Sequence, residues 1–497
     1  MLNNSLRKYL KVIDTIMMMK HTVEKIGGTS MSDYISVRDN IILKGGKQKD
    51  LYQRIFVVSA YGGVTDKLLE YKKSGQPGIF GLFANSLDDT DWLQAIDELV
   101  KHLCDLNQEL FGDTDLLKKA NDFIVQRIEC AKECLVDLHR LCMHGHFALS
   151  GHLDTVREML ASIGEAHSAW NTTHLLQRDG INAVFVDLTG WQTHKHMPLD
   201  VHIADAYKGM NLDIEIPIVT GYAHCEKGVM TSFDRGYSEM IFSRLAVLSN
   251  AAEAIIHKEF HLSSADPRIV GESNAVPIGR TNYDVADQLA NLGMEAIHPK
   301  AAKGLRQNNI PLRIKNTFEP EHTGTLITGD YVSDTPRVEI IAGCKNVYAL
   351  ELFDQNMAGD IHVYDREILA QISRFKGHIV AKDMNANTIT HFLSTNLKTI
   401  KRIRTALEEK YPDAEVNQQK IAIVSAIGSD MKVSGMLAKT VQAVATNGVS
   451  VLAVHQSMRQ VDMQFVVDQS DYEKTVKSLH EALIEIHDHG RAICLAS

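Results

Sequence analysis

The sequence predicts an α/β protein with a mainly parallel sheet, followed by two smaller modules of one repeated design. Short apolar runs bounded by glycine occur at 54–60, 182–188, 216–221 and 252–257, with helical patterns between them. Short Val/Ile-rich strands that alternate with helices are typical of a parallel sheet covered on both faces. After a turn-rich stretch at 328–337, a strand–helix–strand–strand–helix series occurs twice, about 75 residues apart, which indicates a duplicated ferredoxin-like module.

Length, charge and cysteine content restrict the class of protein. The chain has 497 residues, which exceeds what one hydrophobic core usually supports, so about two or three domains are expected. Its 62 acidic and 52 basic residues give a formal net charge of −10, and it has no dense Lys/Arg run, so nucleic acid is not an expected partner. Seven cysteines in a chain of this length favour a reducing cytoplasm over a disulfide framework.

Residues 1–20 are expected to be a short N-terminal extension. The apolar run in this stretch is broken by Lys11 and Asp14, so it is too short for a signal peptide or a membrane segment. We therefore expect a cytoplasmic protein without a membrane partner. The methionines at 17–19 favour a helix face or an upstream start site over a copper site.

Residues 21–330 are expected to form the first domain, with a helical insertion at about 70–145. A strand is predicted to end at Ile26, and a helix is predicted at 32–43. In the insertion the apolar pattern changes to the helical period of 3.6 residues. One stripe of a long helix is formed by Ala120, Ile124, Ile128, Ala131, Leu135, Leu138 and Cys142.

The insertion also contains three cysteines and three histidines that raise the alternative of a zinc site. They are Cys130, Cys134, Cys142, His139, His144 and His146. Their spacing matches no standard set of zinc ligands, and Cys142 lies on the apolar stripe. Buried thiols and surface histidines are therefore the favoured interpretation, and no metal ligand is predicted.

Residues 335–497 are expected to contain the two modules, at about 345–415 and 419–497. Strands are predicted at 347–352, 378–382, 388–394, 420–425, 449–456 and 461–468, with a last strand in "AICLA". Helices are predicted at 362–375, 397–410, 434–446 and 471–486. Paired modules of this kind bind a small molecule or a partner, because their sheet edges can pair. The catalytic chemistry is therefore expected in the first domain.

The stretch "VEKIGGTSM" is a candidate phosphate loop. Gly27 and Gly28 can adopt positive φ angles, so their N–H groups can converge on an anion. Thr29 or Ser30 can cap the helix that follows. Lys25 would add positive charge where negative charge gathers during phosphoryl transfer. Taken alone, the stretch favours an ordinary strand–turn–helix corner with a solvated lysine, because it matches neither the P-loop nor the G-x-G-x-x-G pattern.

Two further stretches repeat this arrangement and shift the balance toward a phosphate site. "VVSAYGGVTD" runs from a strand through Ser59 and a glycine pair to Thr65 at a helix start. "VMTSFDRGYSEM" is expected to run from a strand through Arg235 to Ser238 in a helix. The C-terminal ends of parallel strands lie along one sheet edge, so the three corners can face one crevice. Amide donors, Lys25 and Arg235 would give that crevice the charge to hold a nucleotide and an anionic acceptor.

The order of these motifs resembles that of aspartokinases, from about His21 to the end of the chain. The matching stretches are "EKIGGTS", "VVSAYGGVTD", "ASIGEAHSA", "TSFDRGYSE", "SSADPR", "AIHPKA", "IPLRIKNTFEPEHTGTLI" and the duplicated C-terminal module. The resemblance implies an amino-acid kinase fold followed by two ACT domains. Within the family, "HTVEKIGGTSM" and "HKEFHLSSADPR" are most similar to the type associated with ectoine biosynthesis.

The resemblance also implies the activity and the site residues. The activity would be transfer of a phosphoryl group from ATP, with Mg²⁺, to L-aspartate, which gives 4-phospho-L-aspartate. Lys25 and Glu239 would be the catalytic residues. The residues implied to contact aspartate are Ser59, Thr65, Glu165, Arg235 and Ser238. The residues implied to bind ATP are Gly27, Gly28, Ser30, Lys258, Glu259, Ser263, Arg268 and Lys300.

These roles agree with the chemistry of the acceptor. Aspartate is a zwitterion with a second carboxylate, so Glu165 and Arg235 can hold its α-ammonium and α-carboxylate groups and leave the β-carboxylate free. A carboxylate is already ionised at neutral pH, so no strong general base is required. Catalysis would then depend on alignment and on neutralisation of charge by Mg²⁺, Lys25 and backbone amides.

Several positions differ from the family pattern. Asp234, Tyr237 and Glu239 stand where aspartokinases commonly have glycine, glycine and aspartate. The adenine pocket differs at Lys258, Glu259 and Ser263, whereas Arg268 matches. Glu295 replaces a lysine and would repel phosphate, and Lys300 or Lys303 could supply the missing charge.

These differences leave two alternatives open beside the aspartate kinase. One is a non-catalytic amino-acid sensor with a degenerate nucleotide pocket, and the other is a kinase of another amino acid on the same fold. By resemblance, an amino-acid effector would bind at the loop "FDQNMAGDIH", although lysine, threonine and the absence of an effector all remain open. The oligomer would be a homodimer or a dimer of dimers joined through the ACT domains.

Overall fold

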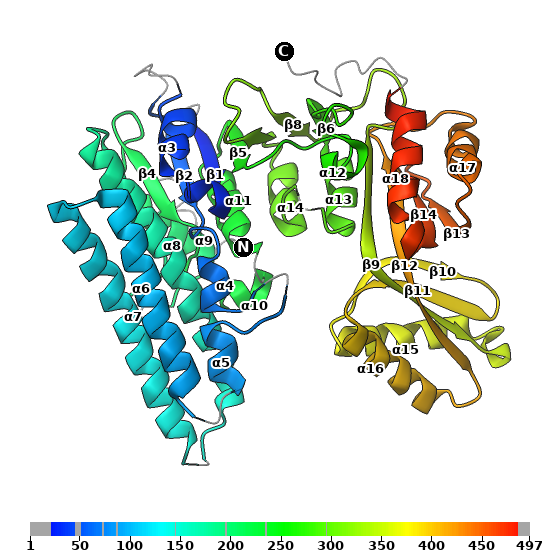
Figure 1. Cartoon of the computed structure of the whole chain (residues 1–497), viewed down its shortest axis with the longest axis horizontal. Helices are drawn as coiled ribbons and strands as arrows, with labels where there is room; N and C mark the ends of the chain where they lie inside the picture. Colours follow the sequence, from blue (N-terminus) through cyan, green and yellow to red (C-terminus); the bar gives the residue numbers. More distant parts are fainter. Residues whose placement is uncertain are drawn as a thin grey trace, which may run out of the picture. The chain divides into compact units, whose positions relative to one another are not determined.

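The computed structural model describes residues 21–44, 51–71, 74–85, 88–144, 146–193, 196–233, 236–294 and 296–485. The chain separates into two compact units, which Figure 1 draws together with their helices and strands. Unit 1 comprises Met1–His261 and Ile297–Gly329, and unit 2 comprises Leu262–Ala296 and Asp330–Ser497.

A mainly parallel sheet forms the centre of unit 1 and confirms the predicted α/β class. Its strands lie in the order β3-β4-β2-β1-β5-β7-β8. Neighbouring strands from β3 to β7 are parallel, and β8 runs antiparallel to β7. The bounds are β1 Thr22–Ile26, β2 Arg54–Val58, β3 Ala183–Val186, β4 Ile216–Thr220, β5 Glu253–Lys258, β7 Leu312–Asn316 and β8 Thr325–Thr328. Every residue of β2 and β4 is buried, as expected for central strands with helices on both faces.

Helices cover this sheet. Helix α8 contacts β3 and β4, helix α11 contacts β1 and β2, and η1 lies against the opposite face of the sheet through bonds to Arg54. The bounds in chain order are α2 Gly28–Met31, α3 Tyr34–Ser36, η1 Val37–Ile42, α4 Val64–Leu68, α5 Ile79–Asn85, α6 Thr90–Phe111, α7 Asp115–Cys142, η3 Leu149–Gly151, α8 Leu153–Arg178, α9 Leu199–Ala206, α10 Val229–Phe233, α11 Tyr237–Leu248 and α14 Pro299–Gln307.

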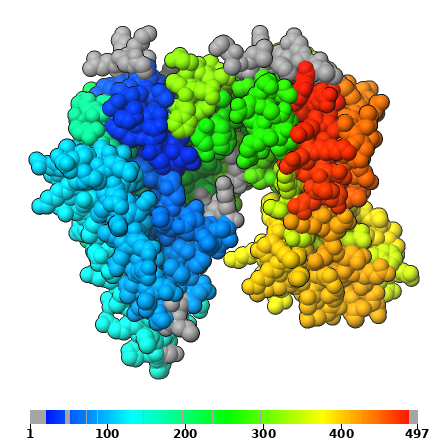
Figure 2. All heavy atoms as spheres, in the orientation of Figure 1, coloured from blue at the N-terminus to red at the C-terminus, as the bar shows by residue number. Residues whose placement is uncertain are grey.

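Helices α5, α6 and α7 lie in the segment where a helical insertion was expected. Their atoms, light blue to cyan, form a continuous surface in Figure 2. The predicted stripe of α7 is buried at Ala120, Ile124, Ile128, Ala131 and Leu135. The stripe is only half-buried at its end, at Leu138 and Cys142.

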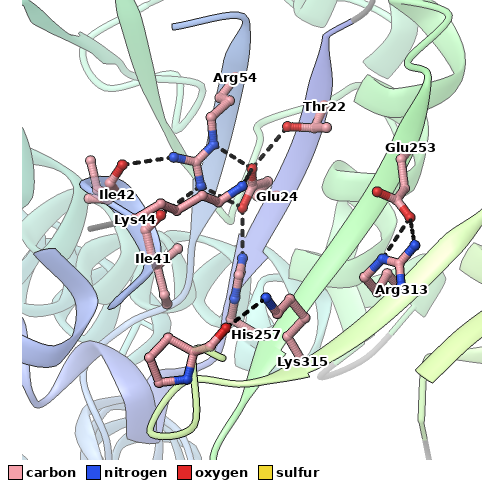
Figure 3. Close-up of polar contacts among 11 residues, drawn as sticks. Thr22, Glu24, Ile41, Ile42, Lys44, Arg54, Glu253, His257, Arg313 and Lys315 are labelled. Atoms are coloured by element: carbon pink, nitrogen blue, oxygen red, sulfur yellow. Dashed lines mark hydrogen bonds and ion pairs between the residues drawn. The ribbon is translucent and has the colours of Figure 1, made fainter. Parts of the chain in front are cut away.

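A fully buried glutamate, Glu24, links three strands of the sheet (Figure 3). Glu24 of β1 accepts hydrogen bonds from Arg54 Nε at 2.6 Å and Arg54 Nη2 at 2.9 Å. Glu24 Oε2 lies 2.7 Å from His257 Nε2 of β5. Arg54 also donates to the carbonyl oxygens of Ile41 and Ile42, at 2.7 and 2.8 Å. One guanidinium group therefore satisfies both a buried carboxylate and the end of η1.

The network leaves Glu24 charged and His257 neutral. Burial would raise the pKa of Glu24, but Arg54 and His257 lower it well below its usual value. Burial lowers the pKa of His257, and the nearby charges of Arg54 and Lys315 act in the same direction, against the effect of Glu24. The sheet thus contains a buried ion pair of Glu24 and Arg54, with a neutral imidazole as a third member.

The C-terminal part of unit 2 contains the two predicted ferredoxin-like modules on one sheet, with the strand order β10-β11-β9-β12-β14-β13. The strands are β9 Ile340–Phe353, β10 His378–Met384, β11 Thr388–Ser394, β12 Glu415–Ile427, β13 Val451–Gln456 and β14 Asp462–Asp468. The helices are η5 Gln355–Met357, α15 Ile361–Arg374, α16 Leu397–Lys410, α17 Met436–Thr446, η6 Gln469–Asp471, α18 Tyr472–His480 and η7 Glu481–Glu485. The predicted strand in "AICLA" lies outside the described residues.

The two modules share their longest strands. The second half of β9 pairs with β11 and with the first half of β12, whereas the first half of β9 pairs with the second half of β12. The second half of β12 pairs with β14. Among the described residues, each module therefore has four strands in a ferredoxin-like order. The fourth strand of the second module is the first half of β9, which precedes the other three strands in the chain.

This sheet bears a cavity of about 460 Å³. Its polar lining residues include Glu351, Asp383, Asn385, Thr388, Thr390 and Gln419, and its apolar lining includes Phe392, Ile421 and Leu452. The two carboxyl groups are the only ionisable side chains in this lining, so the cavity is acidic.

Residues 262–296 belong to the same compact unit as the C-terminal region. They contain α12 Pro267–Val270, β6 Arg280–Asn282 and α13 Tyr283–Asn291. Ile278, Val285 and Leu289 share one hydrophobic core with Ile340 and other residues of β9 and β12. Ser264 Oγ lies 3.0 Å from His480 Nε2 of α18. The compact units divide the chain at other residues than the expected first domain does. The boundary of that domain at 330 stays a prediction.

Candidate active site

The carboxyl ends of the parallel strands in unit 1 meet at one edge of the sheet. Gly27, just after β1, donates its N–H to the carbonyl oxygen of His257 in β5 at 3.1 Å. Ser59, just after β2, donates its N–H to Ile26 at 3.2 Å. Gly221, just after β4, donates to β2 at 2.9 Å. The loops after these strands therefore begin side by side, in the place where α/β sheets bind ligands.

The loop after β1 passes directly into α2, which begins at Gly28. The expectation of positive φ angles at the glycine pair was wrong, because Gly27 has φ −71° and Gly28 is helical. Glycine is required at position 28 for another reason. A Cβ atom there would lie 2.7 Å from the carbonyl oxygen of Ala60, so the loops after β1 and β2 touch through their backbones.

Hydroxyl groups fix this loop on both sides. Ser30 Oγ lies 2.8 Å from Thr317 Oγ1, just after β7, and both are buried. Thr29 and Ser30 lie inside α2, and the following helix α3 is capped by Asp33, which accepts the N–H of Ser36, so the expected capping by Thr29 or Ser30 was wrong. Ser32 Oγ accepts the N–H of Gly62 at 2.9 Å. The loop is therefore held between β7 and the loop after β2.

The third corner begins with a helix, not with the expected strand. Residues 229–233 form α10, and the carboxylate of Glu158 from α8 accepts the N–H groups of Val229 at 3.1 Å and Thr231 at 2.8 Å. This capping satisfies the first N–H groups of the helix, which is why the apolar stretch does not extend into a strand.

Lys25 and Glu239 form an ion pair at the sheet edge. Lys25 Nζ lies 3.5 Å from Glu239 Oε1, and the two side chains are 10% and 12% exposed. Glu239 Oε2 accepts the N–H of His298, the residue before α14. A Cβ atom on Gly236 would lie 2.3 Å from the His298 ring, so the start of α11 and the start of α14 are in close contact.

Glu239 is ionised at neutral pH. Burial alone would raise its pKa, but the positive charges of Lys25 and Lys258 and the N–H of His298 hold the pKa below its usual value. The edge of the sheet therefore carries one fixed negative charge beside two lysines.

Glu165 of α8 lies in the same crevice and is 2% exposed. Tyr237 donates its hydroxyl hydrogen to Glu165 Oε1 at 2.6 Å. Glu165 Oε2 is buried and accepts no hydrogen bond from the described residues. A Cβ atom on Gly221 would lie 3.3 Å from Glu165 Cγ and 2.9 Å from Ser238 Cβ, so no side chain fits between these two residues.

The pKa of Glu165 is shifted into the neutral range. Burial raises it to about 7, although the Tyr237 hydroxyl, backbone N–H groups and the charge of Lys25 act in the opposite direction. A buried carboxyl group with one unpartnered oxygen is suited to receive a cation, because an ionised carboxylate is costly without a partner.

The hydroxyl groups expected to contact the acceptor lie nearby. Ser59 Oγ lies 3.5 Å from Ser238 Oγ, so the ends of β2 and the start of α11 meet. Thr65 is half-buried in the first turn of α4. Helix α4 packs on α8 beside Glu165, since a Cβ atom on Gly164 would contact Val64 at 3.2 Å.

The residues expected to bind ATP divide between the units. Lys258 is the last residue of β5, Glu259 follows it, and both are half-buried in unit 1. Lys300 Nζ donates to the carbonyl oxygen of Ser232 at 2.9 Å and lies over the Phe233 ring, so it closes the end of α10.

Ser263 and Arg268 belong to unit 2. Ser263 pairs with Pro277 in an isolated bridge, and Arg268 is 88% exposed and bound to Asp266 at 2.7 Å. Arg235, Asp234 and Glu295 lie outside the described residues, so the expectations for them stay predictions.

Sequence reasoning missed two participants in this site. His298 was seen only as part of the "AIHPKA" motif, although its N–H binds Glu239 and its ring contacts Gly236. Tyr237 was noted as a replaced glycine, without its bond to Glu165. The His-Pro pair before a helix was the available signal for His298, because it marks a helix start at a loop.

Magnesium fits this site. In the described ranges no group of three or more His, Cys, Asp or Glu side chains could hold a metal ion by itself. Mg²⁺ in kinases needs only one or two carboxylates together with the phosphates of the nucleotide. Glu239 offers such an ionised carboxylate beside Lys25.

The chain matches the sequence profile of the amino acid kinase family over residues 20–316 and that of the ACT domain over residues 424–483. It is 54% identical over 476 residues to aspartate kinase Ask_Ect of Stutzerimonas stutzeri (strain A1501), which covers 96% of this chain and 100% of that protein. It is 25% identical over 500 residues to chloroplastic aspartokinase 2 of Arabidopsis thaliana, which covers 93% of this chain and 84% of that protein.

Solved structures share the fold. E. coli aspartokinase III in complex with aspartate and ADP matches with a TM-score of 0.68 at 18% identity, over 93% of this chain and 99% of that chain. The same enzyme in complex with lysine and aspartate matches with a TM-score of 0.68 at 20% identity, over 94% of this chain and 100% of that chain. Among the described residues, no helix is both long and apolar enough to span a bilayer.

Proposed function

Because the chain belongs to the amino acid kinase family and is an aspartate kinase, we propose that phosphoryl transfer takes place at the edge of the unit 1 sheet, around Lys25 and Glu239. ATP is the co-substrate. One arrangement carries this proposal: Lys25, Glu239 and Glu165 converge where the loops after β1, β2 and β4 meet. Each of these three charged groups suits a different part of the two substrates.

The acceptor is held by its backbone groups. Glu165 binds the α-ammonium of aspartate through Oε2, which has no partner among the described residues. Arg235 binds the α-carboxylate, and Ser59, Thr65 and Ser238 line the space for the β-carboxylate. Two charged contacts and a lining of hydroxyl groups fix the orientation of a small zwitterion.

The transferred group is held by positive charge and backbone N–H groups. The β-carboxylate oxygen of aspartate forms a bond to the γ-phosphorus, and the bond from that phosphorus to the β,γ-bridging oxygen breaks, which leaves ADP. Lys25 stabilises the charge on the moving phosphoryl group, and Gly27, Gly28 and Ser30 shape the loop beside it. Lys258, Glu259 and Lys300 are the further nucleotide contacts that we propose in unit 1.

Glu239 is the residue that we propose to hold Mg²⁺. When bound, the metal neutralises charge on the β- and γ-phosphates. Glu239 also keeps Lys25 extended toward the crevice, since the ion pair of 3.5 Å connects α11 to β1. No residue is assigned as a general base, because the attacking carboxylate is already ionised.

The wider context is also part of the proposal. The identity of 54% with the Ask_Ect kinase supports a cytoplasmic enzyme of the ectoine-associated type. The ACT region would bind an amino-acid effector and join the chains into a homodimer or a dimer of dimers. Two places suit an effector: the loop 353–362 and the acidic cavity that Glu351 and Asp383 line.

A hydroxamate assay tests the proposed site. With aspartate, ATP and Mg²⁺, the wild-type protein should form aspartyl hydroxamate, and Lys25→Ala should lower the rate to near background. Glutamate in place of aspartate tests the alternative of another acceptor and should give little product. Equal rates for wild type and Lys25→Ala would overturn the proposed site.

A further inference from the structure

Tyr237 belongs to a pair of matched contacts along α8. Its hydroxyl donates to Glu165 Oε1 at 2.6 Å, and Tyr222 donates in the same way to Glu158 Oε2 at 2.7 Å. The two glutamates are seven residues apart, so they lie on the same face of α8, two turns from each other. The two tyrosine rings meet edge to face, with centroids 5.8 Å apart.

This packing leaves Tyr237 little freedom. The side chain is 3% exposed, and Tyr222 beside it is 2% exposed. Glu158, at the other end of the contact, is bound by the N–H groups of Val229 and Thr231. The Tyr237 hydroxyl is therefore held in one position by two helices and by a second tyrosine.

The consequence for Glu165 is that its two oxygens are unequal. Oε1 accepts a short hydrogen bond from Tyr237, whereas Oε2 is buried and has no hydrogen-bond partner among the described residues. Rotation of the carboxyl group would break the bond to Tyr237. One oxygen is thus fixed in place and the other is presented to the crevice.

We propose that Tyr237 is a positioning and specificity-determining residue: it locks Oε1 of Glu165 so that Oε2 alone receives the α-ammonium group of an L-amino acid. This inference rests on the proposed role of Glu165. A dicarboxylate without an ammonium group leaves Oε2 buried and unpaired, so the arrangement selects against it. Sites built around a buried polar partner reject analogues that lack the matching group far more strongly than apolar pockets do.

Tyr237→Phe removes the hydroxyl and keeps the ring. We expect kcat/KM for aspartate to fall about 10-fold or more, mostly through KM, with kcat within about twofold. We also expect the preference for aspartate over succinate, measured by hydroxamate formation from both acids, to fall by a similar factor. If Tyr237→Phe leaves both the kcat/KM for aspartate and the preference for aspartate over succinate unchanged, the inference is overturned.

The pH profile supplies a readout that a purely structural role would not move. The groups that act on the Glu165 carboxyl are Tyr237 from α11, Lys25 from β1 and backbone N–H groups of residues 60 and 165. Loss of the donor at 237 removes a contribution that lowers the Glu165 pKa, so the acid limb of kcat/KM should move to higher pH. Incorporation of 3-fluorotyrosine at 237, whose phenol is more acidic, should move the same limb to lower pH.

Tyr207→Phe is the matched control. Tyr207 is a buried tyrosine of unit 1 whose hydroxyl has no hydrogen-bond partner among the described residues. This variant should keep the KM for aspartate, the preference over succinate and the acid limb. A loss in Tyr237→Phe that Tyr207→Phe reproduces would overturn the inference, because it would show a general effect of removing a buried hydroxyl.

Glu165→Gln separates this inference from the proposed function on which it rests. If Glu165→Gln leaves the KM for aspartate unchanged, the proposed role of Glu165 is wrong. If Glu165→Gln raises that KM strongly while Tyr237→Phe behaves like Tyr207→Phe, only the role of Tyr237 is wrong. Should Tyr237→Phe fail to fold, the fluorotyrosine variant still decides, and an unmoved acid limb would overturn the inference.

Discussion

Lys25 Nζ lies 3.5 Å from Glu239 Oε1, and the second oxygen of that carboxylate accepts the N–H of His298. One buried carboxylate therefore connects the first strand of the sheet to the starts of α11 and α14. A lysine held in this way keeps its ammonium group at the sheet edge, where the loops after three parallel strands meet.

Removal of the lysine charge should abolish most of the activity. We expect Lys25→Met to lower kcat by about 10²–10³-fold, because it removes the charge that we propose to stabilise the transition state. The KM for aspartate should change little. Lys132→Met, on the surface of α7 and paired with Asp97, is the control and should keep full activity. A kcat for Lys25→Met within a few-fold of wild type would contradict the assignment.

Glu239 should determine the response to magnesium. Glu239→Gln keeps the size of the side chain and removes its charge, so the Mg²⁺ concentration for half-maximal activity should rise by about 10-fold or more. Glu239→Asp keeps the charge and should recover part of the affinity. The measurement is a titration of activity with Mg²⁺ at a fixed ATP concentration. An unchanged titration in Glu239→Gln would place the metal elsewhere.

The activity should depend on pH through Glu165. Its pKa is raised to about 7 by burial, and only the ionised form can bind the α-ammonium of aspartate. We expect kcat/KM for aspartate to rise through pH 7 and to level off above it, with about a tenth of the maximal value near pH 6. In Glu165→Gln the remaining activity should lack this limb. The same limb in both proteins would assign it to another group.

The same carboxyl group should make the protein less stable at high pH. The pKa of Glu165 is about 7 in the folded state, against 4.5 for an unperturbed glutamate. Between these pH values the folded state binds more protons than the unfolded state, so the free energy of unfolding falls as the pH rises through this window. Glu165→Gln removes the buried charge and should therefore stabilise the ligand-free enzyme at pH 8 by roughly 2–3 kcal/mol. At pH 5 the gain should fall to below about 1 kcal/mol. Thermal unfolding at both pH values measures it.

The buried pair of Glu24 and Arg54 should show strong coupling. Arg54→Met leaves an ionised carboxylate buried without its main partner and should cost about 3–5 kcal/mol of unfolding free energy. Glu24→Gln should be costly for the converse reason. The double variant should lose less than the sum of the two, as measured by urea unfolding in a double-mutant cycle. Additive losses would show that the bonds in Figure 3 contribute independently.

Elements whose signal is local could be predicted from the sequence. The apolar runs of β2 and β4 mark central strands because both faces of these strands are buried. The stripe on α7 follows from the helical period, and the repeated series after residue 337 corresponds to the six strands and four long helices of the C-terminal sheet. These features depend on residues that are close together in the chain.

Features that depend on distant residues could not be read in this way. Tyr237 looks like a replaced glycine until Glu165, 72 residues earlier, is placed beside it. The stretch before Arg235 has the composition of a strand, but Glu158 caps it as a helix. The glycine pair after β1 serves close packing on Ala60 and not a positive φ angle, and sequence alone does not distinguish these two uses of glycine.

The packing of residues 262–296 restricts how this gene can change. A stop codon after Gly329 would delete the strands on which Ile278, Val285 and Leu289 rest and would leave their apolar surface in water. A shortened version of the enzyme would therefore carry an exposed apolar segment in the middle of its chain, so the C-terminal region cannot be lost by simple truncation.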